Sequence, residues 1–189
     1  MEFLHPNDPR VLHKLLHPRH GHANYCRTGG PLRGATIGSM DSPSPPSSRA
    51  LGDDGAVRIA LALVQQTRER DSPDVHVLNL RNNGIGDSGA AQIGLALQEE
   101  GCTINVLDLR DNRIGDEGAS ALAYAIENNY SLHTLLLSGN RINKRGCVVM
   151  HKSLAANANI RVLDLGMNRI DPEPLQALRD EILKRRTGA

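Results

Sequence analysis

The residues of this chain that could do chemistry are charged side chains that recur at nearly equal intervals. Arg81 and Arg110 occupy equivalent places in successive units, and Asp108 and Asp164 stand two units apart, at a period of about 28 residues. Guanidinium and carboxylate groups form strong paired hydrogen bonds, and arginine is enriched at protein interfaces. The pattern therefore predicts recognition of another protein. The alternative is a solvated face whose charges pair with one another, each pair contributing about 0–1 kcal/mol.

Motifs of the common enzyme classes do not accompany these charges. The sequence contains no G-x-S-x-G, no H-E-x-x-H, no paired C-x-x-C and no G-x-x-x-x-G-K-[ST]. We therefore expect no catalytic residue, no cofactor and no metal site. His17, His20, His22 and Cys26 have a spacing that metal ligands could use, but nothing around them would hold such ligands rigidly.

The charged residues recur because they belong to a sequence repeat that occurs four times in the chain. Each copy ends in an asparagine, and these residues recur at the same nearly constant interval: Asn83, Asn112, Asn140 and Asn168. A column that repeats in every unit is architecture rather than a catalytic site. We expect the amides to be structural and to bond backbone groups that the strands leave unpaired.

Two periodicities alternate within each copy. Paired leucines such as Leu107 and Leu109 stand one residue apart, as in a strand, and the second half of each copy has apolar residues spaced by three and four, as in a helix. Asp87 and Asp116 stand where a helix N-cap is expected, and Asp171 precedes a first-turn proline. Gly89, Gly118 and Gly146 are predicted to be packing glycines, not parts of phosphate-binding loops.

The alternation predicts an α/β solenoid with parallel strands on its concave side and helices on its convex side. Parallel strands pack about 4.8 Å apart and helices about 8–10 Å apart, so the stack must curve into a short arc with the strands inside. Strand residues that point away from the core then form one continuous concave surface, joined by a column of Gly84, Arg113, Arg141 and Arg169. We predict that the partner-binding residues are Arg81, Val106, Asp108, Arg110, Leu136 and Asp164, with Leu136 as the exposed apolar centre.

Domain organisation follows from a change in composition near residue 50. Residues 1–50 hold seven of the ten prolines and carry six basic against three acidic residues, and we expect a flexible basic His/Pro/Ser-rich tail and linker. Residues 51–74 match the helical half of a repeat whose strand is missing, which predicts an N-terminal capping helix. Residues 75–189 are predicted to hold four repeats and a C-terminal capping helix. Within the tail, residues 9–18 could form a short amphipathic helix that docks on some surface.

Bulk composition narrows the function classes. The net charge is +1 and aromatic residues make up 2% of the chain, so we expect no nucleic-acid partner, because single strands bind by stacking on aromatic side chains. No apolar run approaches the ~20 residues that a membrane helix needs, and we expect no membrane contact. Three widely separated cysteines predict a reducing, cytoplasmic location.

The strand pattern, the alternating repeat length and the I-G-D-x-G-A helix start resemble ribonuclease-inhibitor-type leucine-rich repeats over residues 51–186. This class includes ribonuclease inhibitor, the Ran GTPase-activating protein, tropomodulin and the repeat domains of NOD-like receptors. The resemblance implies a right-handed horseshoe-type arc and, usually, a protein partner. We therefore expect a non-catalytic interaction module, either a monomer or a subunit of a complex. The alternatives are a GTPase-activating protein for a small GTPase and a structural subunit of a large assembly.

Overall fold

The computed structural model describes residues 36–37, 51–68 and 74–187, in which strands and helices alternate. The strands are β1 (Thr36–Ile37), β2 (Val77–Asn79), β3 (Val106–Asp108), β4 (Thr134–Leu136) and β5 (Val162–Asp164). The helices are α2 (Gly52–Arg68), α3 (Asp87–Leu97), α4 (Asp116–Glu127), α5 (Lys144–Ala156) and α6 (Pro172–Thr187).

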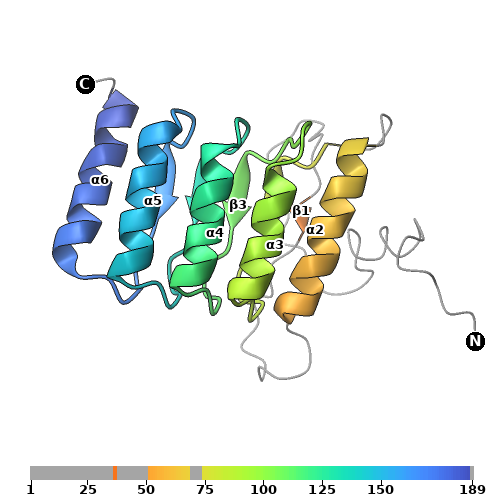
Figure 1. Ribbon diagram of the computed structural model, residues 1–189, viewed down its shortest axis with the longest axis horizontal. Coiled ribbons are helices and arrows are strands. Elements are labelled where there is room, and N and C mark those ends of the chain that lie inside the picture. Colours follow the sequence, from red (N-terminus) through yellow and green to blue (C-terminus); the bar gives the residue numbers. More distant parts are fainter. Residues whose placement is uncertain (1–35, 38–50, 69–73, 188–189) are drawn as a thin grey trace, which may run out of the picture.

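The strands of the described residues form one parallel sheet in sequence order, and the helices stand in a row along one side of it (Figure 1). The register joins equivalent residues of successive repeats, so that Val77 pairs with Val106, Val106 with Thr134, and Thr134 with Val162. This is the predicted α/β leucine-rich-repeat solenoid, with each helix returning the chain to the start of the next strand.

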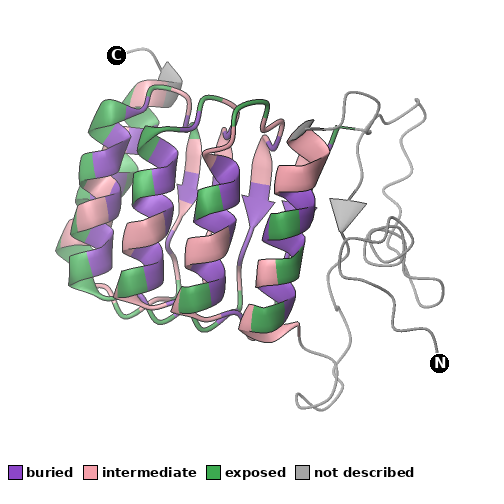
Figure 2. Ribbon diagram, turned by 45° about the vertical axis from the view of Figure 1, so that its right-hand side comes forward, coloured by how far each residue is buried: buried purple, intermediate pink, exposed green. Residues whose placement is uncertain are grey.

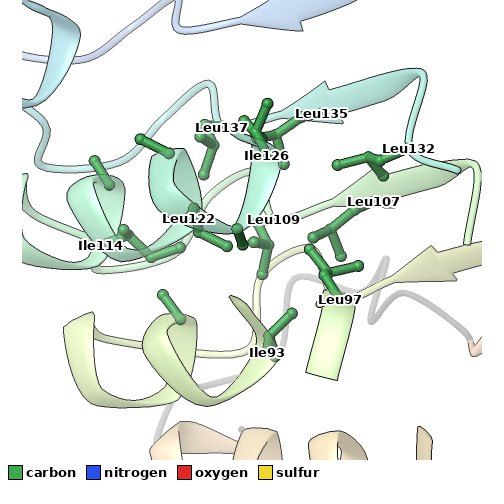
Figure 3. Close-up of a cluster of buried hydrophobic side chains, with 14 of the residues drawn as sticks. Ile93, Leu97, Leu107, Leu109, Ile114, Leu122, Ile126, Leu132, Leu135 and Leu137 are labelled. Carbon is green, nitrogen blue, oxygen red and sulfur yellow. The ribbon is translucent and has the colours of Figure 1, made fainter. Parts of the chain in front are cut away.

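The core lies between the sheet and the inward faces of the helices, which are buried while their outward faces are exposed (Figure 2). Leu107, Leu109, Leu122 and Ile126 pack in this layer together with their counterparts from the neighbouring repeats (Figure 3). The predicted strand phase is confirmed, because Leu135 and Leu137 are fully buried and Leu136 between them is not.

The prediction that α2 lacks a preceding strand is wrong. Thr36 and Ile37 form β1 and pair in parallel with Val77 and Leu78 of β2. No repeat pattern marks this strand, because its residues lack the paired leucines and because its connection to α2 is longer than the loops that follow β2 to β5. The rest of the segment 1–50, including the tail histidines and residues 9–18, lies outside the described residues.

Helices α3 to α5 are capped by the preceding repeat, and the prediction that Asp87 and Asp116 cap their own helices is wrong. The N-cap residues are Gly86, Gly115 and Asn143; the two glycines have no side chain, and that of Asn143 makes no capping bond. Instead, Asp87 Oδ1 accepts hydrogen bonds from the backbone N–H groups of Gly115 (2.6 Å) and Gly118 (2.9 Å), one repeat further along. Each aspartate therefore caps the helix of the next repeat, and its negative charge interacts favourably with the positive N-terminal end of that helix dipole.

The same bond recurs in the neighbouring repeats. Asp53 accepts from Gly86 and Gly89, and Asp116 accepts from Asn143 and Gly146. The close approach explains the packing glycines, because a Cβ on Gly118 would lie 2.6 Å from Asp87 Oδ1 and 2.9 Å from Asp87 Cα.

The series of capping aspartates ends at α5. Lys144 occupies the position equivalent to Asp116 and supplies no acceptor, while Pro174 occupies the position equivalent to Gly146 and has no N–H to donate. Between α5 and α6, the sequence therefore lacks both the carboxylate acceptor and the backbone N–H donor of this capping bond. Helix α6 is held in another way: its Arg185 guanidinium donates to the carbonyl oxygens of Leu154 and Asn157.

Candidate functional site

The candidate site is the outward surface of strands β2 to β5. The sheet register places Asp108 directly beside Leu136, and Leu136 directly beside Asp164. Parallel strands lie about 4.8 Å apart, so these three side chains are neighbours on one surface. Val106 begins the same strand as Asp108 and is half-buried. Four of the six predicted site residues are therefore brought together by pairing of the strands.

Asp108 and Arg110 form the best-ordered charged pair on this surface. Arg110 donates from Nη2 to Asp108 Oδ2 at 2.6 Å and from Nε to both carboxylate oxygens, and its backbone N–H donates to Asp108 Oδ1 at 3.0 Å. These hydrogen bonds raise the pKa of the Arg110 guanidinium above its ordinary value. Asp108 itself is only 5% exposed, so its carboxylate is largely engaged by Arg110, in the turn after β3, instead of being presented to solvent.

Arg81 is held by a residue that the sequence analysis did not single out. Its Nε lies 2.7 Å from Oδ2 of Asp111, in the loop after β3, so the pair links two successive repeats. Both side chains are about two-fifths exposed, at 40% and 42%, and such a pair contributes at most about 1 kcal/mol to stability. The separation of this pair in sequence is close to the repeat length and could have suggested a contact between neighbouring loops.

Leu136 differs from the expectation in one respect: it is half-buried rather than exposed. Side chains on the inside of an arc converge, and the residues directly beside Leu136 are Asp108 and Asp164. The carboxylate of Asp164 also accepts the backbone N–H of Gly166 at 2.9 Å, which fixes its position beside the leucine. The surface is therefore an apolar side chain set between two ordered carboxylates.

The repeated asparagines lie in the turns that follow the strands of this surface and bond the backbone of those turns. Asn112 is 7% exposed; its Oδ1 accepts from the backbone N–H groups of Asn83 (3.1 Å) and Ile85 (3.0 Å), and its Nδ2 donates to three backbone carbonyls. Asn140 and Asn168 make the equivalent bonds between later repeats. These hydrogen bonds thereby join the turn after each strand to the equivalent turn of the preceding repeat.

A second pair of buried asparagines was missed by sequence reasoning. Asn129 and Asn157 stand one repeat apart, ahead of β4 and β5, and are 3% and 4% exposed. Each amide oxygen accepts two backbone N–H groups of its own loop. Each Nδ2 donates to a backbone carbonyl near the end of the helix one repeat earlier, Leu97 of α3 for Asn129 and Ile126 of α4 for Asn157. The sequence pattern of these asparagines is weak, because the equivalent position in the preceding repeat is Gly101.

The loop from β2 to α3 contains a string, Gly84 to Gly89, with the G-x-G-x-x-G spacing typical of phosphate-binding loops. In the structure the N–H groups of Gly86 and Gly89 already donate to the carboxylate of Asp53. An internal anion therefore occupies the place where a phosphate would bind, which favours the packing interpretation of these glycines.

Within residues 36–37, 51–68 and 74–187, no three His, Cys, Asp or Glu side chains are grouped so that they could hold a metal ion. The tail residues with ligand-like spacing, His17, His20, His22 and Cys26, fall outside these ranges. Among the helices of the described part of the chain, none combines the length and apolarity that crossing a bilayer requires.

The comparisons with known proteins agree with the fold. The family model described as Leucine Rich repeat matches residues 71–94, 102–123 and 156–178. A search of curated protein sequences finds no significant match. Among solved structures, the chain is similar to one titled Leiomodin-1 Actin-Binding Site 2, with a TM-score of 0.54, 20% identity, and coverage of 74% of this chain and 80% of the other.

Proposed function

Because this chain is a leucine-rich-repeat solenoid of the ribonuclease-inhibitor type, we propose that it is a protein–protein interaction module that binds its partner with the outward face of strands β2 to β5. The observation that carries the proposal is the row Asp108, Leu136 and Asp164, set side by side by the sheet register. An apolar side chain surrounded by charge is the arrangement expected of an interface hot spot.

Pre-ordering of the surface supports the same proposal. Asp108 and Arg110 are locked together, Arg81 is tied to Asp111, and Asp164 is bonded to the backbone. A partner that binds such a surface immobilises few side chains, and each side chain already held saves about 0.5–1.5 kcal/mol of ordering cost on binding. Val106 completes the surface next to this cluster.

The proposed module acts by binding alone, without a catalytic step, cofactor or metal. We place it in the cytoplasm, since the described cysteines Cys102 and Cys147 are both free thiols. Actin is the first partner to test, because the similar leiomodin-1 structure is titled an actin-binding site. Sedimentation of the full chain with filamentous actin, and native electrophoresis with actin monomers, would measure this directly.

The test of the binding face is Leu136→Ala, measured by affinity purification from cells of the source organism and by titration with the captured partner. Truncating a hot-spot leucine should cost about 2 kcal/mol of binding free energy, which weakens binding more than tenfold. The matched control is Leu95→Ala, since Leu95 is 57% exposed on α3, on the opposite side of the molecule. A loss of binding with Leu95→Ala and none with Leu136→Ala would place the interface on the helices.

A second control separates binding from folding. Leu137→Ala removes a fully buried side chain one residue further along and should destabilise the fold by about 2–5 kcal/mol. Leu136 is half-buried, so its truncation should cost about 1 kcal/mol of folding stability. The thermal midpoint of each variant therefore distinguishes a lost contact from a damaged fold.

A further inference from the structure

Three arginines stand in equivalent places in three consecutive repeats. Arg113, Arg141 and Arg169 follow the structural asparagines, and all three are exposed. Their backbone N–H groups donate to Ile85 (2.7 Å), Ile114 (2.8 Å) and Ile142 (2.8 Å) of the preceding repeats. These bonds join the loops of successive repeats beyond the ends of the strands, with the register shifted by two residues, so that Arg169 pairs with Asn143. We call Arg113, Arg141 and Arg169 the arginine ladder.

The direction of the ladder follows from its neighbours along the chain. Asn112 and Ile114, on either side of Arg113, are both buried, and so are Asn140 and Ile142 on either side of Arg141. In extended backbone, alternate residues point to opposite sides, so the arginine between two inward residues points outward. The guanidinium groups therefore extend the strand surface along the edge where the strands end.

The charges of the ladder are not neutralised within the described part of the chain. Arg81 and Arg110 are paired with aspartates, but no hydrogen bond or ion pair joins the side chains of the ladder to any described carboxylate. The capping carboxylates Asp87 and Asp116, which begin the neighbouring helices, are engaged by backbone N–H groups. Three like charges thus stand side by side in a protein whose net charge is only +1.

We propose that the arginine ladder binds an extended acidic segment of the protein partner. This inference rests on the proposed function and names the chemistry that the partner must present. Side chains on one face of an extended segment recur every second residue, so three carboxylates at alternate residues span four residue steps, about 13 Å at about 3.3 Å each. Arginine side chains are long and flexible, so carboxylates at this spacing can meet guanidinium groups from three consecutive repeats. Each guanidinium group can bind a carboxylate with two parallel hydrogen bonds.

The surroundings favour a peptide over a nucleic acid. Glu117, Asp171 and Glu173 are exposed near the starts of α4 and α6, close in the chain to the ladder, and repel any anion that extends beyond the three arginines. A nucleic acid carries a charge on every phosphate, so this repulsion is larger for a continuous phosphate backbone than for a short segment with a few carboxylates. The described tyrosines Tyr124 and Tyr130 lie in α4 and in the loop after it, away from the strand ends, so no aromatic side chain of the described residues stands beside the arginines to stack on bases. A short acidic segment can be positioned on the arginines alone.

The test uses the full chain and a fluorescent twelve-residue peptide of alternating glutamate and serine, with a glutamine–serine peptide as the neutral control. Fluorescence anisotropy should show saturable binding of the glutamate peptide that weakens as salt rises, and no binding of the glutamine peptide. Arg141→Gln should weaken binding about fivefold, and the triple replacement of the ladder by glutamine more than tenfold. The control variant is Arg58→Gln, an exposed arginine on α2, which should leave the affinity unchanged.

Three results would overturn the inference: equal binding of the two peptides, equal effects of Arg141→Gln and Arg58→Gln, or tighter binding of a single-stranded oligonucleotide of matched charge. Far-ultraviolet circular dichroism and the thermal midpoint establish that each variant is folded. The Leu136→Ala experiment separates this inference from the proposed function. If Leu136→Ala abolishes partner binding while the acidic peptide fails to bind, the ladder assignment fails and the interaction face stands.

Discussion

Asp87 is the residue whose removal tests the coupling between repeats most sharply. Its Oδ1 accepts the N–H groups of Gly115 and Gly118 at 2.6 and 2.9 Å, and neither donor has another partner within the first turn of α4. Asp87→Ala leaves both donors without an acceptor. A stranded backbone donor costs about 1–3 kcal/mol when buried, and here water can reach the partly buried site. We therefore expect a loss of about 2 kcal/mol in the free energy of unfolding.

Asp87→Asn refines the same prediction, because it keeps an acceptor oxygen and removes the charge. Charge-assisted bonds are roughly twice as strong as neutral ones, so the loss should be about 1 kcal/mol. Urea denaturation followed by circular dichroism measures both variants, and the slope of the transition should stay unchanged. The control is Ser88→Ala, an exposed neighbour in the same turn. If Asp87→Ala is no more destabilising than Ser88→Ala, helices are not capped across repeats and the reasoning is refuted.

Three further predictions concern the loops and the C-terminal end. Asn112→Ala should lower the free energy of unfolding by about 1–3 kcal/mol, because it strands backbone groups in two repeats; an unchanged urea midpoint would contradict this. Met167 is 85% exposed at a φ of 52°, and Asn82 fills the equivalent position with a φ of 56°, so Met167→Asn should raise stability by about 0.5–1 kcal/mol in thermal melts. Truncation after Asn168 removes Leu178 and Ile182 of α6 from the core, and light scattering should detect aggregation; a monodisperse, cooperatively folded product would show that α6 is not the cap.

The periodicity of the sequence predicts most of the fold. Leu135 and Leu137 are buried and Leu136 is not, because alternation along a strand allows only two phases and the leucines define one of them. The register of Asp108, Leu136 and Asp164 also follows from the repeat length, since parallel strands that succeed one another in sequence pair at equivalent positions. Side-by-side placement of the candidate site could therefore be predicted before any coordinates.

Contacts between repeats could not be predicted from positions alone. The cap acceptor Asp87 stands at the expected N-cap position of its own helix, but its carboxylate reaches the helix of the next repeat because the helix starts lie side by side. The Asp108–Arg110 pair forms within one repeat, between the last residue of β3 and the turn that follows it, although a pattern of columns suggests pairing across strands. β1 has no leucine pattern, and only its hydrogen bonds to β2 identify it as a strand. Such features depend on three-dimensional proximity, which the period does not encode.

Photo-cross-linking most directly tests the claim that the strand face is the binding surface. A photoreactive amino acid is placed at Thr134, whose half-buried side chain lies on β4 between Val106 and Val162, and in a parallel sample at Leu95, on the helical side. Each full-length variant is irradiated with extract of the cells that express the protein, and adducts are identified by mass spectrometry. We expect one dominant protein adduct from position 134 and none of the same protein from position 95. The same adduct from position 95, with none from position 134, would contradict binding at the strand face.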